Sequence, residues 1–259
     1  TEILALSEVG RARVLLDLGQ FAAAQAAADS AVANDPTLNY QMENSLNSPR
    51  QYNGMWNFSE ADDAWGVANL KLGNGLNFIS AQDPRILWTD GHQLGSLGAT
   101  PIGQDTIYFQ LKYPTKDASA TLASATEATL ISAEVDLHNG NVSSWANKLN
   151  TLRANSGLTQ TFYDTTATSP ALVVDTIVQP LPPLTADSTS LASHDTQIEV
   201  HFRERAFWLW LTGDLRRLIH QYNHNDFPAN PTRDIRFSIP VSETNNPNFK
   251  GCLDAGAEQ

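Results

Sequence analysis

Two stretches of this chain, far apart in the sequence, share one helical pattern. Residues 2–33 place apolar side chains at helical spacing, and Gly19 interrupts them before an alanine-rich half. Residues 126–157 repeat this plan around Gly140, which lies 121 positions after Gly19. Because glycine adopts the left-handed conformation that ends a helix without a steric penalty, each stretch is predicted to be a hairpin of two helices. The pair favours a mainly helical fold.

Helix–turn–helix units that recur along a chain are typical of tetratricopeptide-like repeats, which stack into a solenoid. These two units stand much further apart than the roughly 34 residues of adjacent repeats, so we expect a solenoid that a large insertion interrupts. Two unrelated helical hairpins would share the same pattern, and this alternative stays open. We treat the chain as one domain (1–259) made of a first hairpin (1–35), an insertion (36–118), a second hairpin (119–157) and a C-terminal part (158–259).

The insertion differs in composition from the two hairpins. It is rich in Asn, Gly, Ser, Pro and aromatic residues, and helical periodicity fades along it. Short strands are predicted at 86–88 and at 107–111. In the second, Phe109 and Gln110 are expected on opposite faces, because apolar and polar residues alternate there as in a half-buried strand. Residues 158–195 are predicted to form another loop region with an extended proline-rich segment.

A helix is predicted towards the C-terminus, where apolar residues recur at steps of three and four from Ile198 to Gly213. Phe207, Trp208 and Trp210 widen this stripe until the helix is apolar on nearly all sides. We therefore expect it to be the central helix, with both tryptophans in the core. The charged residues around it are predicted to form ion pairs rather than an anion site; they are Glu199, Arg203, Glu204, Arg205, Asp214, Arg216 and Arg217.

Three segments of the sequence resemble the SusD/RagB family of outer-membrane nutrient-binding lipoproteins. The first is Asp83-Pro84-Arg85 in the insertion. The second is the helical run Arg203, Glu204, Arg205, Ala206 and Phe207, followed by Gly213, Asp214, Leu215, Arg216 and Arg217. The third is a closing motif of Ile239, Pro240, Glu243, Asn246, Pro247 and Asn248, which is more specific than the helix alone. The resemblance reaches, motif by motif, from Leu4 to Cys252.

This resemblance implies a SusD-like fold, in which tetratricopeptide-like hairpins pack against a large irregular insertion with a few short strands. It implies a protein on the surface of a bacterial outer membrane that captures an oligosaccharide or a peptide and delivers it to a SusC-like TonB-dependent transporter. It implies neither an enzyme nor a cofactor. Members of the family also carry a signal peptide, a lipid-modified cysteine and further helical repeats, and we expect these upstream of Thr1.

Candidate ligand-binding residues lie in the insertion, where the family builds its glycan sites from exposed aromatic side chains. A sugar ring packs its C–H face on an indole or phenol ring, while amide and carboxylate groups bond its hydroxyls; ligand sites generally combine such apolar and polar groups. The predicted ligand residues are Tyr52, Trp56, Phe58, Asp62, Trp65 and Trp88. Burial of these rings in a core is the alternative, for Trp56 and Trp65 above all.

Two other functions are compatible with the sequence. A helical-repeat adaptor that binds another protein and no small ligand is the first. A glycoside hydrolase that uses acids near Asp62 is the weaker one, because the sequence is poor in convergent catalytic groups. Two carboxyl groups facing each other across a cleft would favour it. His220 and His224 have a spacing compatible with zinc, but the His-Glu-x-x-His motif is absent, and we predict no metal site.

Composition narrows the range of partners. The formal net charge of −12 argues against nucleic acid and anionic membrane surfaces, both of which favour basic patches. It does not exclude uncharged sugars. The single cysteine, Cys252, permits no internal disulfide and no cysteine metal cluster. The sequence also lacks an apolar run of the roughly 18 residues that a membrane-spanning helix requires.

Overall fold

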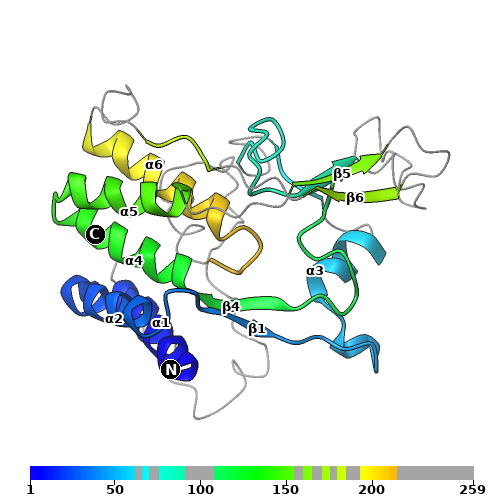
Figure 1. Ribbon diagram of the computed structural model, residues 1–259, viewed down its shortest axis with the longest axis horizontal. Helices are drawn as coiled ribbons and strands as arrows, with labels where there is room; N and C mark the ends of the chain where they lie inside the picture. Colours follow the sequence, from blue (N-terminus) through cyan, green and yellow to red (C-terminus); the bar gives the residue numbers. More distant parts are fainter. Residues whose placement is uncertain are drawn as a thin grey trace, which may run out of the picture.

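The computed structural model describes residues 1–61, 66–69, 76–90, 108–154, 160–164, 171–175, 180–184 and 193–214. Within these ranges the protein is mainly helical with a few short strands, which confirms the predicted fold class. The longer helices gather on the left of Figure 1. A two-stranded ribbon leads from these helices towards the short elements of the insertion on the right.

The first predicted hairpin is confirmed. Helices α1 (Glu2–Asp17) and α2 (Phe21–Asn34) pack against each other, and Gly19 between them has a φ of +70°. Four alanines of α2 are fully buried, and their small side chains let neighbouring helices approach closely; they are Ala24, Ala27, Ala28 and Ala31. With the buried side chains of α1 they form most of one core cluster.

The second predicted hairpin is also confirmed. Helix α4 (Ala125–His138) begins at an N-cap, Ser124, whose hydroxyl accepts a hydrogen bond from the Glu127 N–H at 3.2 Å. Gly140, with a φ of +75°, follows the end of α4 and leads into α5 (Val142–Ala154). Both hairpins thus turn at a glycine in the left-handed region.

Gly140→Ala is expected to destabilise the protein by about 1 kcal/mol, because an alanine side chain is strained at this φ. Nothing lies within 4 Å of the position that a Cβ would take, so the backbone alone accounts for the penalty. Gly10→Ala, inside α1 and equally open, is the matched control and should stabilise by about 0.5–1 kcal/mol. Urea unfolding of both variants checks the pair, and equal effects would contradict it.

The two hairpins lie side by side although the insertion separates them in sequence. Strand β1 (Asn39–Met42) pairs antiparallel with β4 (Ala120–Ser124), so the two ends of the insertion are fastened together. The N–H of Ala125 also donates to the Leu38 carbonyl at 2.9 Å. This ribbon places α2 directly against α4. That the two hairpins are repeats of one interrupted solenoid stays a prediction.

The central helix is α4, and the expectation that the C-terminal helix would be central is wrong. Every residue from 130 to 137 is buried, because α4 contacts α1, α2, α5 and α6. Helix α6 (His194–Trp208) is less enclosed: Ile198 and Phe202 are only half-buried and Arg203 is exposed. Its buried positions include charged residues, which the apolar-stripe pattern did not anticipate.

Helix α6 also ends earlier than predicted. A capping box between Ser193 and Thr196 begins it, and it stops at Trp208. Leu211 and Gly213 then have φ values of +58° and +79°, so the chain turns where the apolar pattern suggested further helix. Trp210 in this turn is buried and Trp208 is half-buried, so both contribute to core packing as predicted.

The insertion contains short elements. They are a 3₁₀ turn η1 (Pro49–Gln51), α3 (Gly54–Trp56), a π-helical turn η2 (Asn57–Ala61), and the strands β2 (Trp88–Asp90) and β3 (Tyr108–Gln110), which pair antiparallel. Gln110 is buried like Phe109, contrary to the alternation, because its amide bonds both the N–H and the carbonyl of Tyr113 at 2.8 and 2.9 Å. Phe207 and Trp210 pack against residues of this insertion in a second core cluster.

The prediction of a loop over residues 158–195 is wrong in one part. Strands β5 (Gln160–Asp164) and β6 (Ala171–Asp175) form an antiparallel hairpin there. The proline-rich segment runs along the end of α5, where Leu181 donates its N–H to the Arg153 carbonyl at 2.9 Å.

Candidate functional site

Three of the predicted ligand residues lie on one short stretch of the insertion. Tyr52 follows η1, Trp56 ends α3, and Phe58 lies in η2. Tyr52 and Trp56 are half-buried, whereas 55% of Phe58 is exposed. Asn53 holds this stretch in shape, because its side-chain oxygen caps α3 by accepting the N–H groups of Met55 and Trp56 at 2.9 and 3.0 Å.

A lysine from a distant segment completes this group. The Lys116 ammonium lies 5.5 Å from the ring centroid of Tyr52 and 5.2 Å from that of Trp56. Such a position over two rings is attractive, because the face of an aromatic ring is electronegative. We call Tyr52, Trp56 and Lys116 the aromatic platform.

Hydrogen bonds to residues 116–118 fix the backbone beneath the aromatic platform. The Asn53 N–H donates to the Lys116 carbonyl at 2.7 Å, and the Asn53 side chain donates to the Ala118 carbonyl at 2.9 Å. Asn44 donates to the same Ala118 oxygen at 2.7 Å. The asparagines of this stretch therefore support the loop that carries both rings.

The remaining predicted ligand residues lie elsewhere. Trp88, on β2, is half-buried and packs edge-on against Tyr108, with ring centroids 5.2 Å apart. It also packs against the second core cluster, so its role in ligand binding stays a prediction. Asp62 and Trp65 lie outside the described residues, as does Asp63, so the prediction of a carboxylate at the site stays open.

Two of the resemblance motifs meet in a buried ion network. Arg85 forms a two-pronged contact with Glu204 of α6, at 2.7 and 3.2 Å, and another with Asp83, at 2.6 and 2.8 Å. Arg153 reaches the same Glu204 carboxylate at 2.5 Å, and the indole N–H of Trp208 donates to it at 3.2 Å. The side chains of Arg85 and Glu204 are 3% and 5% exposed. This network joins the insertion to α5 and α6.

Within this network, Asp83 and Arg85 stabilise each other's charged forms. Burial by itself would raise the pKa of Asp83, but the Arg85 guanidinium outweighs it and holds that pKa below its ordinary value. Asp83 also accepts the Arg85 N–H at 3.0 Å across the turn that contains Pro84. The Asp83-Pro84-Arg85 motif thus forms a hydrogen-bonded turn that directs the Arg85 side chain towards Glu204.

The other motif residues of the helical run have structural contacts too. Arg203 bonds the Asn77 side chain at 2.9 Å and lies 4.4 Å from the Phe207 ring centroid. Arg205 and Asp214 form the predicted ion pair, at 2.8 and 3.1 Å, and Gly213 permits the turn between them. Arg216, Pro240, Glu243, Asn246 and Pro247 lie outside the described residues.

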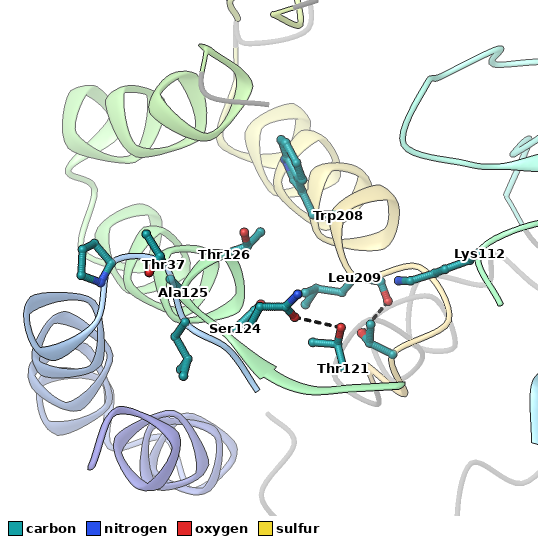
Figure 2. Close-up of a pocket in the computed structure, with 12 residues that line it drawn as sticks. Thr37, Lys112, Thr121, Ser124, Ala125, Thr126, Trp208 and Leu209 are labelled. Carbon is teal, nitrogen blue, oxygen red and sulfur yellow. Dashed lines mark hydrogen bonds between the residues drawn. The ribbon is translucent and has the colours of Figure 1, made fainter. Parts of the chain in front are cut away.

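A pocket of about 340 Å³ opens where α4, α6 and the β1–β4 ribbon meet (Figure 2). Its wall is made by the start of α4, the end of α6 with the following turn, residues in and before β1, residues of β4, and Lys112. Most of the polar side chains that line it carry hydroxyl groups; the lining comprises Pro36, Thr37, Leu38, Asn39, Lys112, Thr121, Ser124, Ala125, Thr126, Trp208, Leu209 and Thr212. We call it the hydroxyl pocket.

Lys112 is the one charged side chain among the described residues that line the hydroxyl pocket. Figure 2 shows it extending towards Leu209, and its ammonium donates to the Trp210 carbonyl. Burial lowers the pKa of Lys112 to about 8, because a charged amine is poorly solvated there. Among the described residues, no carboxylate pairs with it.

Sequence reasoning missed both Lys116 and the hydroxyl pocket. Lys116 is distant in sequence from the rings that it contacts, and nothing in its neighbours distinguishes it from a surface lysine. The hydroxyl pocket draws residues from four separated segments. The one feature of the sequence that could have pointed to the pocket is Lys112. This charged residue directly follows the predicted strand 107–111, which is largely apolar.

A second pocket of about 290 Å³ lies across the turn from the first and shares Leu209 and Thr212 with it. Its lining includes paired charges: Arg13 bonds Glu127, and Arg205 bonds Asp214. Within the described ranges, no group of three metal-ligating side chains was found. Of the helices that the structure describes, none is both long enough and apolar enough to span a membrane.

Comparison with known proteins gives one similar structure. No family model matches the sequence, and no curated protein matches it. Among solved structures, the chain is similar to a SusD-like carbohydrate binding protein from Bacteroides vulgatus, with 19% sequence identity and a TM-score of 0.42. The match covers 80% of this chain and 43% of that protein, so the chain spans less than half of its length.

Proposed function

We propose that this chain belongs to a cell-surface binding protein that captures an oligosaccharide or a peptide and passes it to a SusC-like TonB-dependent transporter of a bacterial outer membrane. The observation that carries the proposal is the aromatic platform, in which two half-buried rings stand on a loop fixed by hydrogen bonds. Rings held in this way offer apolar area without a large cost in side-chain entropy.

Capture and release suit the chemistry of the aromatic platform. Its rings match the C–H face of a sugar or an apolar peptide side chain, while the Lys116 ammonium donates to an oxygen of the ligand. Phe58, exposed two residues beyond Trp56, extends the apolar surface. These groups bind and orient a ligand, and the sequence motifs resemble a family of binding proteins, so we propose a binding protein rather than an enzyme.

The ion network supports the same proposal through the sequence motifs. Asp83-Pro84-Arg85 and Arg203-Glu204 were recognised separately as SusD/RagB-like, and they meet in space through the pair of Arg85 with Glu204. Delivery to a transporter and the surface location rest on that resemblance. The described residues supply the scaffold and the aromatic platform on which the proposal depends.

Trp56→Ala is expected to weaken ligand binding about 5- to 30-fold, since truncation of a central aromatic contact typically costs roughly 1–2 kcal/mol. Titration calorimetry with a panel of neutral oligosaccharides and short peptides measures this. Leu46→Ala is the matched control, because Leu46 is an exposed apolar residue of the same insertion, 59% accessible, outside the aromatic platform. Equal affinities in both variants, or no binding by the wild-type chain, would count against the proposal.

A helical-repeat adaptor is the second candidate, and one observation favours it. Helix α1 and the residue that caps its C-terminus expose four large apolar side chains, between 51% and 64% accessible; they are Ile3, Leu4 and Val14 in the helix and Leu18 at the cap. An adaptor would use such a face to bind another protein. In that case binding would survive Trp56→Ala and fail when Val14 and Leu18 are replaced by aspartate.

A further inference from the structure

The hydroxyl pocket has the dimensions and lining of a small-ligand site. Its volume of about 340 Å³ falls at the lower end of the range for ligand pockets, roughly 300–1,000 Å³. Leu38, Ala125 and Leu209 are apolar residues of the lining, and hydroxyl and amide side chains make up most of the rest of it. Its lining shares no residue with the aromatic platform, so the inference does not depend on the function proposed above.

The hydroxyl groups of the pocket are oriented by the protein. Thr121 donates to the Asn39 side-chain oxygen at 3.0 Å, as the dashed line in Figure 2 marks, and Thr212 donates to the Leu209 carbonyl at 2.7 Å. Thr37 donates to Asp35 at 2.9 Å. Each of these hydroxyl groups already donates its hydrogen to a group of the protein. Its oxygen keeps lone pairs that accept a hydrogen bond from a ligand. A ligand with several hydroxyl donors satisfies these acceptors.

Lys112 adds the requirement for a negative charge. Its ammonium has three N–H groups, and the Trp210 carbonyl takes one of them. Within the described ranges no carboxylate offsets its charge; a partly buried cation of this kind is costly, and a ligand carboxylate would remove that cost while forming a charge-assisted hydrogen bond. The second pocket differs here, because its arginines bond carboxylates of the protein.

We propose that the hydroxyl pocket binds a small polyhydroxylated carboxylate of the size and chemistry of a hexuronic acid. The carboxylate contacts the Lys112 ammonium, and the ligand hydroxyls donate to Thr37, Thr121 and Thr212. The Asn39 amide and the Thr126 hydroxyl complete the polar contacts. Neither a neutral sugar nor a simple carboxylate supplies both halves of this recognition.

Titration calorimetry of the chain at neutral pH with sodium glucuronate, glucose and sodium acetate tests the proposal. Glucuronate is expected to bind about tenfold or more tightly than either of the other two. Lys112→Met should weaken glucuronate binding roughly 10- to 100-fold, as the loss of a hydrogen bond between charged groups predicts. Thr126→Val, which keeps the side-chain shape, should weaken it about 3- to 10-fold.

Arg11→Met is the control for the loss of one positive charge, because Arg11 lies on the exposed face of α1, paired with Glu8. It should leave glucuronate affinity unchanged. Unchanged affinity in Lys112→Met would overturn the proposal, as would equal affinities for glucose and glucuronate or the absence of glucuronate binding. Thermal unfolding of each variant confirms that it is folded before the affinities are compared.

Discussion

Glu204→Gln is expected to lower the free energy of unfolding by about 3–5 kcal/mol, the range for removing one partner of a buried ion pair. The substitution keeps the shape of the side chain but removes the charge that two arginines share. Arg85 would retain Asp83, whereas Arg153 would lose the carboxylate at 2.5 Å. The side chain at this position is 5% exposed, so water offers little compensation.

Chemical denaturation with guanidinium chloride, followed by far-ultraviolet circular dichroism, measures the effect. Glu8→Gln serves as the control, because the pair of Glu8 with Arg11 lies on the surface and such pairs contribute about 0–1 kcal/mol. A loss below about 1 kcal/mol for Glu204→Gln would show that the network is not a stabilising element. If the variant is less stable but its native state keeps the same helical content, the substitution has weakened the packing between the insertion and the helices.

The stability of the wild-type protein is expected to rise between pH 8 and pH 10.5 relative to that of Lys112→Met. The folded-state pKa of Lys112 is lowered from 10.5 to about 8, so in this window the folded chain releases a proton that the unfolded chain keeps. Stability increases with pH wherever the unfolded state binds more protons. Below pH 8 both states are charged, and the full burial penalty opposes folding.

The expected difference is roughly 2–3 kcal/mol, slightly less than the pKa change implies because Lys112 is only partly buried. Urea unfolding of both proteins at several pH values from 7 to 10.5 measures it. Burial also raises the pKa of Tyr113, but this residue is present in both proteins and its contribution cancels. Parallel stability curves for the two proteins would contradict the assignment of the burial penalty to Lys112.

The parts of the fold that depend on local periodicity were predictable from the sequence. Gly19 and Gly140 marked both hairpin turns, because a left-handed residue after a helix leaves a recognisable glycine. The pairing of β1 with β4 was not predictable, since its register joins segments about 80 residues apart. The end of α6 was also missed. Tertiary contacts decide it: the Tyr113 hydroxyl donates to the Leu211 carbonyl at 2.9 Å and fixes the turn.

The candidate site was predictable only in part. Tyr52, Trp56 and Phe58 could be singled out as aromatics in a polar stretch, and their close spacing already placed them together. Whether each ring is buried or exposed depends on long-range packing, which composition does not contain. Lys116 illustrates the limit, because its position over two rings results from backbone hydrogen bonds between distant loops.

The β1–β4 ribbon has an evolutionary consequence. The pairing of β1 with β4 holds both ends of the insertion together beside α2 and α4. The two helices are therefore connected at the same positions, whatever the length of the insertion. The entropy of closing a loop grows only slowly with its length, by about 0.6 kcal/mol for each doubling. Lineages that carry this ribbon are free to lengthen, shorten or exchange the intervening segment. The intervening segment can thus change in length without a change in how the helices pack.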